Sequence, residues 1–425
     1  MLFLYDVILS IALLVALPYL LPKVLLGRHG LKERLGLWSK EFFRRAKSDP
    51  ILWLHAASVG EVNSLAAFLP ILRKRAPGYQ FILSVTTRTG KERASRLRGE
   101  VRWIFYLPVD LSFLVRRVLH WTNPKVLLLV ETELWPNLIL QAQRRGVKLA
   151  LINGRLSARS FARYKIFPGP MAHILTSLDL LCVQTEEDAH RFRALGAEGS
   201  KVMVTGNFKE DLLAVPQMRA ERELVRGALG IPDGTHVLVA GSTRPGEENE
   251  IAETIVSLRN ENNTFRAIVA PRHVKRAKKV ARLLATKGLE VQRYSLGERL
   301  QAAHWDVLVV DILGQLMRLY SAADVAFVGG SLLPYGGHNP LEPAAYGIPV
   351  LFGHHMEHCR RSAQLLLHGG GGIQVANGIE LKKIASRLFH SDQERRRRGR
   401  AALRAVQESR GSSEKTVQAL KETVL

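Results

Sequence analysis

The stretch GGSLLPYGGHNPLEPAAYGIPVLFG, Gly329–Gly353, predicts a glycine-rich turn, a helix and a strand in close succession. It follows an apolar run, Val325–Val328, that is typical of a buried strand. Asn339 is placed to cap the helix, Pro340 occupies the first helical position, and Glu342 stands three residues after the cap. A strand, a turn and a helix in this order indicate an α/β fold.

The same stretch predicts a phosphate site at the start of the helix. Glycines let the backbone approach a ligand, and free N–H groups together with the helix dipole attract an anion. The alternative is that Asn339 and Glu342 form only a structural capping box. Three other segments repeat the change from strand to turn, which favours the phosphate site.

Composition narrows the class of protein. A chain of 425 residues with 47% apolar and 23% charged residues fits two globular domains. The formal net charge of +23 favours nucleic acid, anionic lipid or phosphorylated substrates as partners. Two cysteines, Cys182 and Cys359, exclude a disulfide framework and fit a reducing compartment.

Residues 1–22 are expected to form a hydrophobic membrane anchor. No charge occurs from Val7 to Pro22, and the apolar segment approaches the roughly 20 residues that span a bilayer. Eight basic residues follow from Lys23 to Lys47, which predicts that the body of the protein is cytoplasmic. The alternative is an apolar helix that lies on the membrane surface or docks on the first domain.

Apolar runs alternate with amphipathic helical stretches along the whole chain, the pattern of parallel βαβ units. We expect two doubly wound domains of similar size that face a cleft, 23–212 and 213–391, with charged helices at 392–425 packing back on the first domain. The predicted strands are 51–55, 80–85, 101–106, 126–130, 148–152, 180–183 and 201–205 in the first domain, and 236–240, 265–270, 290–294, 307–310, 325–328 and 349–352 in the second.

Ligands of such sheets bind beyond the carboxyl ends of the strands. In the first domain, Glu61 follows one strand at capping-box spacing from Ser58, so a general base and a cap are both open readings. Glu131 follows another strand directly, where a carboxylate is costly unless it serves a site. Lys209 is either a cation for a bound anion or a solvated side chain.

In the second domain, the strand ends carry small residues and cations. Ser242, Thr243 and Arg244 follow one strand, and Pro271 and Arg272 follow the next. Such residues suit phosphate or carboxylate binding. The chain has no Asp-x-Asp, no Walker A sequence and no histidine spacing that matches a zinc template, so no metal and no other cofactor is expected.

These residues resemble the 3-deoxy-D-manno-octulosonic acid (Kdo) transferases of lipopolysaccharide assembly. The matching motifs run in order through nearly the whole chain: HAASVGE (55–61), YLPVDL (106–111), ETELWPN (131–137), NGRLSARS (153–160), GNFK (206–209), GSTR (241–244), PRH (271–273), DILGQL (311–316) and GGHNPLEPAAYGIPV (336–350). The combination of ETELWPN with HNPLEPAA is highly specific.

The resemblance implies a GT-B glycosyltransferase that moves Kdo, with inversion, from CMP-Kdo to a hydroxyl of a lipid A precursor, lipid IVA, at the cytoplasmic face of the inner membrane. It implies Glu61 as the general base and Glu131 and Lys209 as stabilisers of the transition state. It implies a CMP site made of Pro271, Arg272, Leu313, Gly314, Gln315, Asn339, Pro340, Leu341 and Glu342, with Ser242, Thr243 and Arg244 as further phosphate or carboxylate contacts. Nucleic acid is not an expected partner.

The chain departs from the family pattern at Gln315, where Glu is commoner, and in the loop Gly353–Cys359. Two rival functions stay open at this point. One is a GT-B epimerase or hydrolase that acts on a nucleotide sugar without an acceptor. The other is a basic protein that binds nucleic acid at the membrane, although its basic residues are scattered rather than interleaved with aromatic ones.

Overall fold

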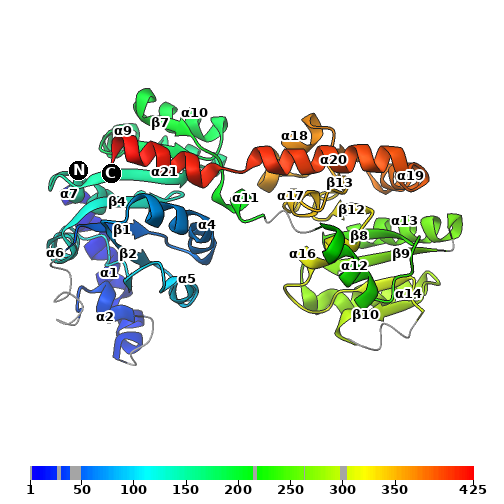
Figure 1. Ribbon diagram of the computed structural model, residues 1–425. Helices are drawn as coiled ribbons and strands as arrows, with labels where there is room; N and C mark the ends of the chain where they lie inside the picture. Colours follow the sequence, from blue (N-terminus) through cyan, green and yellow to red (C-terminus); the bar gives the residue numbers. More distant parts are fainter. Residues whose placement is uncertain (1, 26–29, 39–48, 214–217, 263, 297–303) are drawn as a thin grey trace. The chain divides into compact units, whose positions relative to one another are not determined.

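A computed structural model describes residues 2–25, 30–38, 49–213, 218–262, 264–296 and 304–425. The chain forms two compact units, one of Met1–Leu212 with Arg410–Leu425 and one of Leu213–Ser409. Each unit contains a seven-stranded sheet in which all paired strands are parallel, with helices on its faces (Figure 1). The expected α/β fold with two doubly wound sheets is therefore confirmed.

The sheet of the first unit has the strand order β3-β2-β1-β4-β5-β6-β7. Its central strands are almost entirely buried, because helices cover both faces of a parallel sheet and continuous apolar runs fill both. The strands are β1 (Ile51–His55), β2 (Gln80–Val85), β3 (Trp103–Tyr106), β4 (Pro124–Val130), β5 (Lys148–Gly154), β6 (Leu180–Val183) and β7 (Val202–Val204).

Helices of the first unit pack on this sheet as two separate apolar cores, one on each face. Stacked rings of Phe68 and Phe208, 4.7 Å apart, join α4 to α11 in one of them. The α-helices are α1 (Leu2–Leu25), α2 (Leu31–Arg34), α4 (Val59–Arg75), α5 (Arg88–Ala94), α6 (Ser112–Thr122), α7 (Pro136–Gln143), α8 (Ala158–Tyr164), α9 (Pro168–Thr176), α10 (Glu186–Ala194), α11 (Phe208–Asp211) and α21 (Ser412–Thr423).

The sheet of the second unit has the order β10-β11-β9-β8-β12-β13-β14. Its strands are β8 (His236–Thr243), β9 (Phe265–Pro271), β10 (Val291–Arg293), β11 (Val307–Val309), β12 (Val325–Val328), β13 (Val350–Phe352) and β14 (Gly372–Gln374). The α-helices are α12 (Met218–Ala228), α13 (Glu247–Glu261), α14 (Ala277–Thr286), α16 (Leu316–Leu319), α17 (Leu341–Ala344), α18 (Arg360–His368), α19 (Gly378–His390) and α20 (Asp392–Ser409).

All thirteen predicted strands are present, with ends that shift by at most a few residues. The strand β14 was not expected, since Gly372–Gln374 is short and begins at the last of four consecutive glycines. The strand ends that matter for function are neighbours: β8 lies between β9 and β12, and Thr243 pairs with Pro271 while Gly241 pairs with Val328. Loops after these strands therefore gather at one edge of the sheet.

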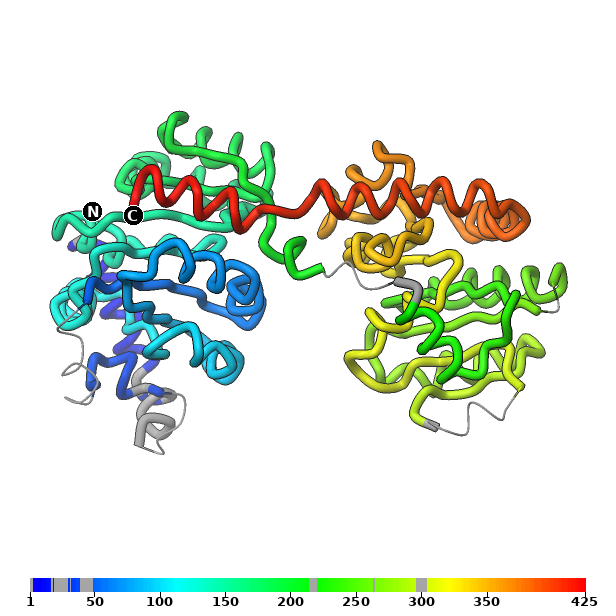
Figure 2. Tube along the Cα trace, viewed as in Figure 1, coloured from blue at the N-terminus to red at the C-terminus, as the bar shows by residue number. Residues whose placement is uncertain are grey.

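The C-terminal segment is divided between the two units, which corrects the expectation that all of 392–425 packs on the first domain. Helix α20 packs on α17, α18 and α19 and belongs to the second unit. Only α21 packs on the first unit, where it contacts α4, α11 and β6 (Figure 2). The apolar side chains Ala402, Ala405 and Val406 of α20 are buried in the core of the second unit. Their burial favours packing of α20 on this unit, although the rest of the helix is charged.

Asp211 holds the start of α21. Its carboxylate accepts hydrogen bonds from the backbone N–H groups of Gly411, Ser412 and Ser413 at 2.7, 3.1 and 2.7 Å. These amides have no partner within the helix, so the distant carboxylate acts as its N-cap.

The change Asp211→Ala is expected to loosen α21 by about 1–2 kcal/mol, the usual cost of a lost N-cap. Hydrogen exchange of the α21 amides measures this, because local opening then speeds up by about five- to thirtyfold. The exposed Glu422→Ala, at the far end of the same helix, is the control and should leave exchange at Ser412 and Ser413 unchanged. Equal exchange in the wild type and in Asp211→Ala would contradict the capping role.

The N-terminal segment forms the helix α1, which is fastened to the first unit by its first turns. The Asp6 carboxylate accepts hydrogen bonds from the Ser112 amide at 3.1 Å and from the Asn137 side chain at 2.7 Å. Within the described part of the chain, no helix meets the length and apolarity needed to cross a membrane. The contacts of Asp6 fit the alternative of a helix docked on the first domain, and attachment of residues 1–22 to a membrane stays a prediction. Much of the basic stretch from Lys23 to Lys47 lies outside the described residues.

Candidate functional site

Glu61 lies in the first turn of α4, directly beyond the end of β1. Its side chain takes part in the cap of α4, and the pKa of its carboxyl group is shifted. One carboxylate oxygen accepts the Ala57 amide at 2.6 Å, and the other accepts the Ser58 hydroxyl at 2.8 Å. Burial, and next the negative charge of Glu133, raises the pKa of Glu61 to about 7. The capping reading is therefore confirmed, and the cap holds in place a carboxyl group with a pKa near neutral pH, which suits a general base; that catalytic role stays a prediction.

A chain of hydrogen bonds leads from the sheet to Glu133. The ring of His55, fully buried, lies 2.8 Å from the Ser84 hydroxyl through Nδ1 and 3.3 Å from the Glu133 carboxylate through Nε2. Ser84 accepts from the Trp53 indole at 2.8 Å, and Glu133 accepts from the Trp135 indole at 2.7 Å. Since Ser84 accepts from Trp53, its proton can be donated to Nδ1, and His55 then donates to Glu133 through Nε2.

The change Glu133→Gln is expected to lower the pKa of Glu61, because it removes the nearby negative charge while glutamine can still accept from Trp135. The predicted role of Glu61 as a general base requires its deprotonated form, and activity should then rise with pH through its pKa, near 7 in the wild type. The acidic limb of the rate profile should move to lower pH by up to about one unit. The exposed Glu92→Gln is the control. An unmoved limb would show that Glu133 does not tune Glu61.

Glu131 and Lys209 are brought together. The Lys209 Nζ lies 3.5 Å from a Glu131 carboxylate oxygen, while 44% of the Lys209 side chain is exposed, so a role in binding an anion stays a prediction. Glu131 has a φ of 58° and Asn153 one of 52°, the left-handed region that non-glycine residues rarely adopt. The Asn153 side chain accepts the Phe208 amide at 3.1 Å, which positions the turn that carries Lys209.

In the second unit, Glu247 occupies the amides that the sequence predicted to be free for a phosphate. Its fully buried carboxylate accepts the N–H groups of Gly330, Ser331 and Leu332 at 2.7, 2.8 and 2.8 Å, and that of Arg244 at 3.0 Å. The first part of the glycine-rich turn is thus an anion site that the protein fills with its own side chain. The prediction of free turn amides is wrong for these residues.

Cations gather at the edge formed by the ends of β8 and β9. The Arg244 guanidinium lies 2.9 Å from His273 Nε2, and it stacks over the Tyr335 ring at 5.3 Å. The Arg272 amide donates to the Thr243 carbonyl at 3.0 Å, which fastens the two strand ends together. Ser242, before them, has a φ of 57°. The second unit thus presents Arg244, Arg272 and His273 together at one edge of its sheet.

The short helix α17 contains Leu341 and Glu342 in its first turn, and Asn339 and Pro340 directly precede it. Asn339 caps it by accepting the Leu341 amide at 3.2 Å, but the helix starts at Leu341 rather than at Pro340. Burial raises the pKa of the Glu342 carboxyl to about 7, and the charge of Arg272 opposes this shift. The positive charge of Arg272 therefore acts on the buried Glu342 carboxyl at the start of α17.

Leu313, Gly314 and Gln315 form the turn between β11 and α16. Leu313 is 77% exposed and Gly314 has a φ of 83°. The Gln315 side chain accepts the Tyr294 hydroxyl at 3.2 Å. These three residues lie at the same sheet edge, since β11 pairs with β9. The hydrogen bond of Gln315 leads to Tyr294, directly after β10, rather than to Arg272 or Asn339.

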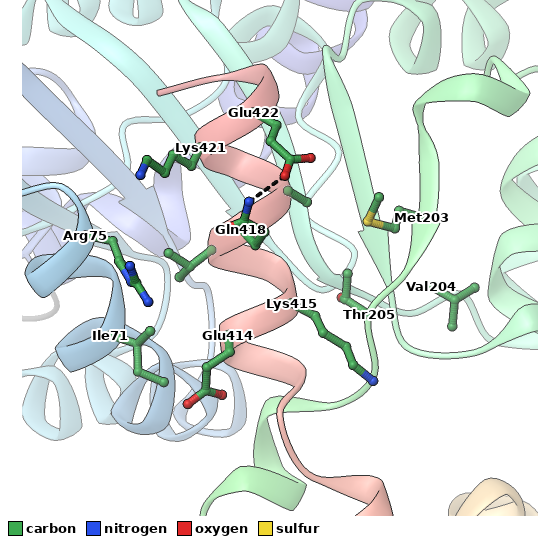
Figure 3. A pocket seen from close by; sticks show the side chains of 12 residues that line it. Ile71, Arg75, Met203, Val204, Thr205, Glu414, Lys415, Gln418, Lys421 and Glu422 are labelled. Carbon is green, nitrogen blue, oxygen red and sulfur yellow. Dashed lines mark hydrogen bonds between the residues drawn. The ribbon is translucent and has the colours of Figure 1, made fainter.

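A cavity of about 430 Å³ lies in the first unit between α4, β7 and α21, away from the residues described above (Figure 3). Ile71, Met203, Lys415 and Glu422 are among its lining residues, and Gln418 donates a hydrogen bond to Glu422 within it. It holds none of the predicted site residues. Among the described residues no cluster of histidine, cysteine and acidic side chains is arranged to hold a metal ion.

Comparison with known proteins identifies relatives over nearly the whole length of the chain. The family described as 3-deoxy-D-manno-octulosonic-acid transferase (kdotransferase) matches residues 29–212. The transferase of that name from Haemophilus influenzae is 32% identical over 397 residues, which are 93% of this chain and 91% of the relative. The one from Chlamydophila psittaci is 33% identical over 92% of this chain and 89% of its own.

Among solved structures, the fold is similar to that of UDP-GlcNAc 2-epimerase from Neisseria meningitidis bound to UDP-GlcNAc. The two structures share a TM-score of 0.60 at 14% sequence identity, and the match covers 88% of this chain and 100% of the epimerase chain. At this identity the likeness concerns the fold alone.

Proposed function

This chain belongs to the 3-deoxy-D-manno-octulosonic acid transferase family, and from that premise we propose that it transfers Kdo from CMP-Kdo to a hydroxyl of a lipid A precursor. It is a Kdo-transferring enzyme of lipopolysaccharide biosynthesis. The observation that carries the finer proposal is the Glu61 carboxylate, which the Ala57 amide and the Ser58 hydroxyl hold beyond the end of β1 and whose pKa burial raises to about 7.

Glu61 acts on the acceptor. A sugar hydroxyl is a poor nucleophile until a base takes its proton, and a carboxylate with a pKa near 7 is well matched to that task. The activated oxygen attacks the anomeric carbon of Kdo from the side opposite the phosphate, so the configuration inverts. Lys209, paired with Glu131, supplies a positive charge for the carboxylate of Kdo or for negative charge that develops in the transition state.

The second unit holds the donor. Arg272, with Arg244 beside it, meets the phosphate, which gains negative charge as the bond to Kdo breaks. Glu342 binds ribose hydroxyls, with Asn339 at the start of the same helix. Pro271 and Leu313–Gln315 complete the binding of cytidine, as in the family pattern.

The test is a turnover assay with CMP-Kdo generated in situ and a tetra-acylated lipid A precursor, read by mass spectrometry of the lipid. Lipid that carries Kdo supports the proposal, and its mass counts the units added. Release of CMP without modified lipid would instead favour a hydrolase, and folded protein that neither modifies lipid nor releases CMP would contradict the assignment.

We further propose that the enzyme works at the cytoplasmic face of the inner membrane, attached through α1 lying along the surface. Phe3, Leu14 and Val15 of this helix are 82%, 66% and 78% exposed, an arrangement that suits contact with acyl chains. The net charge of +23 suits an anionic leaflet and a phosphorylated acceptor.

Changing Phe3, Leu14 and Val15 to serine is expected to reduce binding to anionic vesicles at least about tenfold, since burial of one such side chain contributes about 1.5–3 kcal/mol. Co-flotation with vesicles measures this. The control is Ile379→Ser in the second unit, which removes an equally exposed apolar side chain, 79% exposed, away from α1. Equal flotation of the triple variant and the control would exclude α1 as the attachment.

A further inference from the structure

Two buried nitrogen atoms of the second unit, His338 Nε2 and Arg244 Nε, have no hydrogen-bond partner among the described residues. Both side chains lie against Gly330. A Cβ added there would be 3.4 Å from His338 Nε2 and 3.5 Å from Arg244 Cγ. Because a guanidinium N–H only donates, the partner that Arg244 lacks is an acceptor. Glycine at 330 thus leaves room for two side chains that each carry an unpartnered buried nitrogen, and the nitrogen of Arg244 calls for a ligand with acceptor oxygens.

The groups that face His338 come from several elements and are all basic. Arg244 follows β8, Arg272 and His273 follow β9, and His358 lies in a short 3-10 helix, Glu357–Cys359. Burial first, and then the charges of these groups, lowers the pKa of the His338 imidazole to about 4. In this arrangement the imidazole is neutral at pH 7, where it adds no charge to the cluster.

A bound phosphate would favour the protonated form of the His338 imidazole instead of the neutral form. Its negative charge compensates Arg244 and Arg272, the same cations that disfavour the imidazolium form. A protonated Nε2 then donates a charge-assisted hydrogen bond to a phosphate oxygen, which is stronger than a bond from the neutral ring.

We propose that His338 binds the donor phosphate through Nε2 and takes up one proton from solvent as it does so. This inference deepens the proposed function and rests on it. When Kdo is transferred, the electron pair of the bond between the anomeric carbon and the phosphate oxygen goes to that oxygen, and the acceptor proton goes to Glu61. The phosphate gains one negative charge, so the His338 imidazolium stabilises the leaving group more than the bound donor. His338 keeps its proton until CMP leaves.

The experiment measures CMP affinity between about pH 5.5 and 8 in the wild type and in His338→Asn. Uptake of one proton makes affinity fall about tenfold per pH unit, so the wild type should lose up to about tenfold more affinity per unit than the variant. Titration of CMP itself is common to both proteins and cancels in the difference. Calorimetry in buffers of different ionisation enthalpy should show about one more proton taken up by the wild type.

Two further variants assign the proton. His358→Asn removes a neighbouring histidine and should keep the steep pH dependence that His338→Asn loses. Glu342→Gln removes a carboxyl with a pKa of about 7; it is expected to weaken CMP binding, since Glu342 is proposed to bind ribose, but to keep the loss of affinity with rising pH that His338 causes. In histidine-labelled wild type, the NMR resonance of the His338 ring should shift to the protonated position when CMP is added at pH 7. This reading does not depend on folding of the His338 variant.

A His338 resonance unchanged by bound CMP, or equal pH slopes in the wild type and His338→Asn, would overturn the role of His338 while leaving the donor site intact. Absence of CMP binding by the wild type would overturn the donor site itself and this inference with it.

Discussion

The variant Glu61→Gln is expected to lose turnover by about 10²–10⁴-fold, the usual contribution of a positioned general base. Glutamine can still accept the Ala57 amide, so the first turn of α4 is kept while the group that takes the proton is lost. The rate of Kdo transfer to the lipid acceptor at saturating substrates measures this. Binding of CMP should be unchanged, since its proposed residues belong to the other unit.

The variant Ser58→Ala distinguishes the role of Glu61 in the helix cap from its proposed role as a base. It removes the hydroxyl that donates to Glu61 at 2.8 Å but leaves the carboxylate in place. This hydrogen bond lowers the pKa of Glu61, so its loss should raise that pKa and move the acidic limb to higher pH, with most of the activity kept at high pH. Similar residual activity of Glu61→Gln and Ser58→Ala at every pH would mean that Glu61 serves only as a cap.

The variant Glu247→Ala is expected to destabilise the second unit by at least about 3 kcal/mol. It removes the acceptor of four backbone amides, three of them in the turn after β12, and each buried donor left without a partner costs about 1–3 kcal/mol. For a unit of this size the thermal midpoint should fall by about 6–12 °C. Calorimetry of the full chain measures this, and CMP affinity should fall with it because the same carboxylate also holds the backbone amide of Arg244.

The matched control is Glu253→Ala on the same helix, α13. Glu253 is exposed and pairs with Lys287 at 3.4 Å, a surface ion pair of the kind that contributes at most about 1 kcal/mol. Glu247→Gln should be intermediate, since the amide has one acceptor oxygen where the carboxylate has two. A melting curve of Glu247→Ala that overlays that of the control would contradict the role of this carboxylate.

Periodicity and turn chemistry are sufficient to predict the two parallel sheets and the positions where their strands end. Buried parallel strands need continuous apolar runs, and helices between them need an amphipathic repeat, so both patterns can be read locally. Glu131 and Arg272 are predicted for the same reason, because a polar residue directly after such a run is placed at the ligand-binding edge; Glu61 is predicted from its place in the first turn of the helix that follows the run. The family roles of these residues come from the resemblance and stay predictions.

What local patterns do not contain is the partner of each polar group. Glu247 reaches amides 83 to 85 residues away, and His55 joins Ser84 to Glu133. The apolar length of residues 1–22 likewise predicts an anchor, whereas the docking of Asp6 on Asn137 depends on a contact 131 residues distant. Such contacts exist only once the sheets have brought the loops together. Tertiary structure therefore decides which amides, cations and carboxylates stay available to a ligand, because each buried polar group is satisfied by whichever neighbour the fold provides.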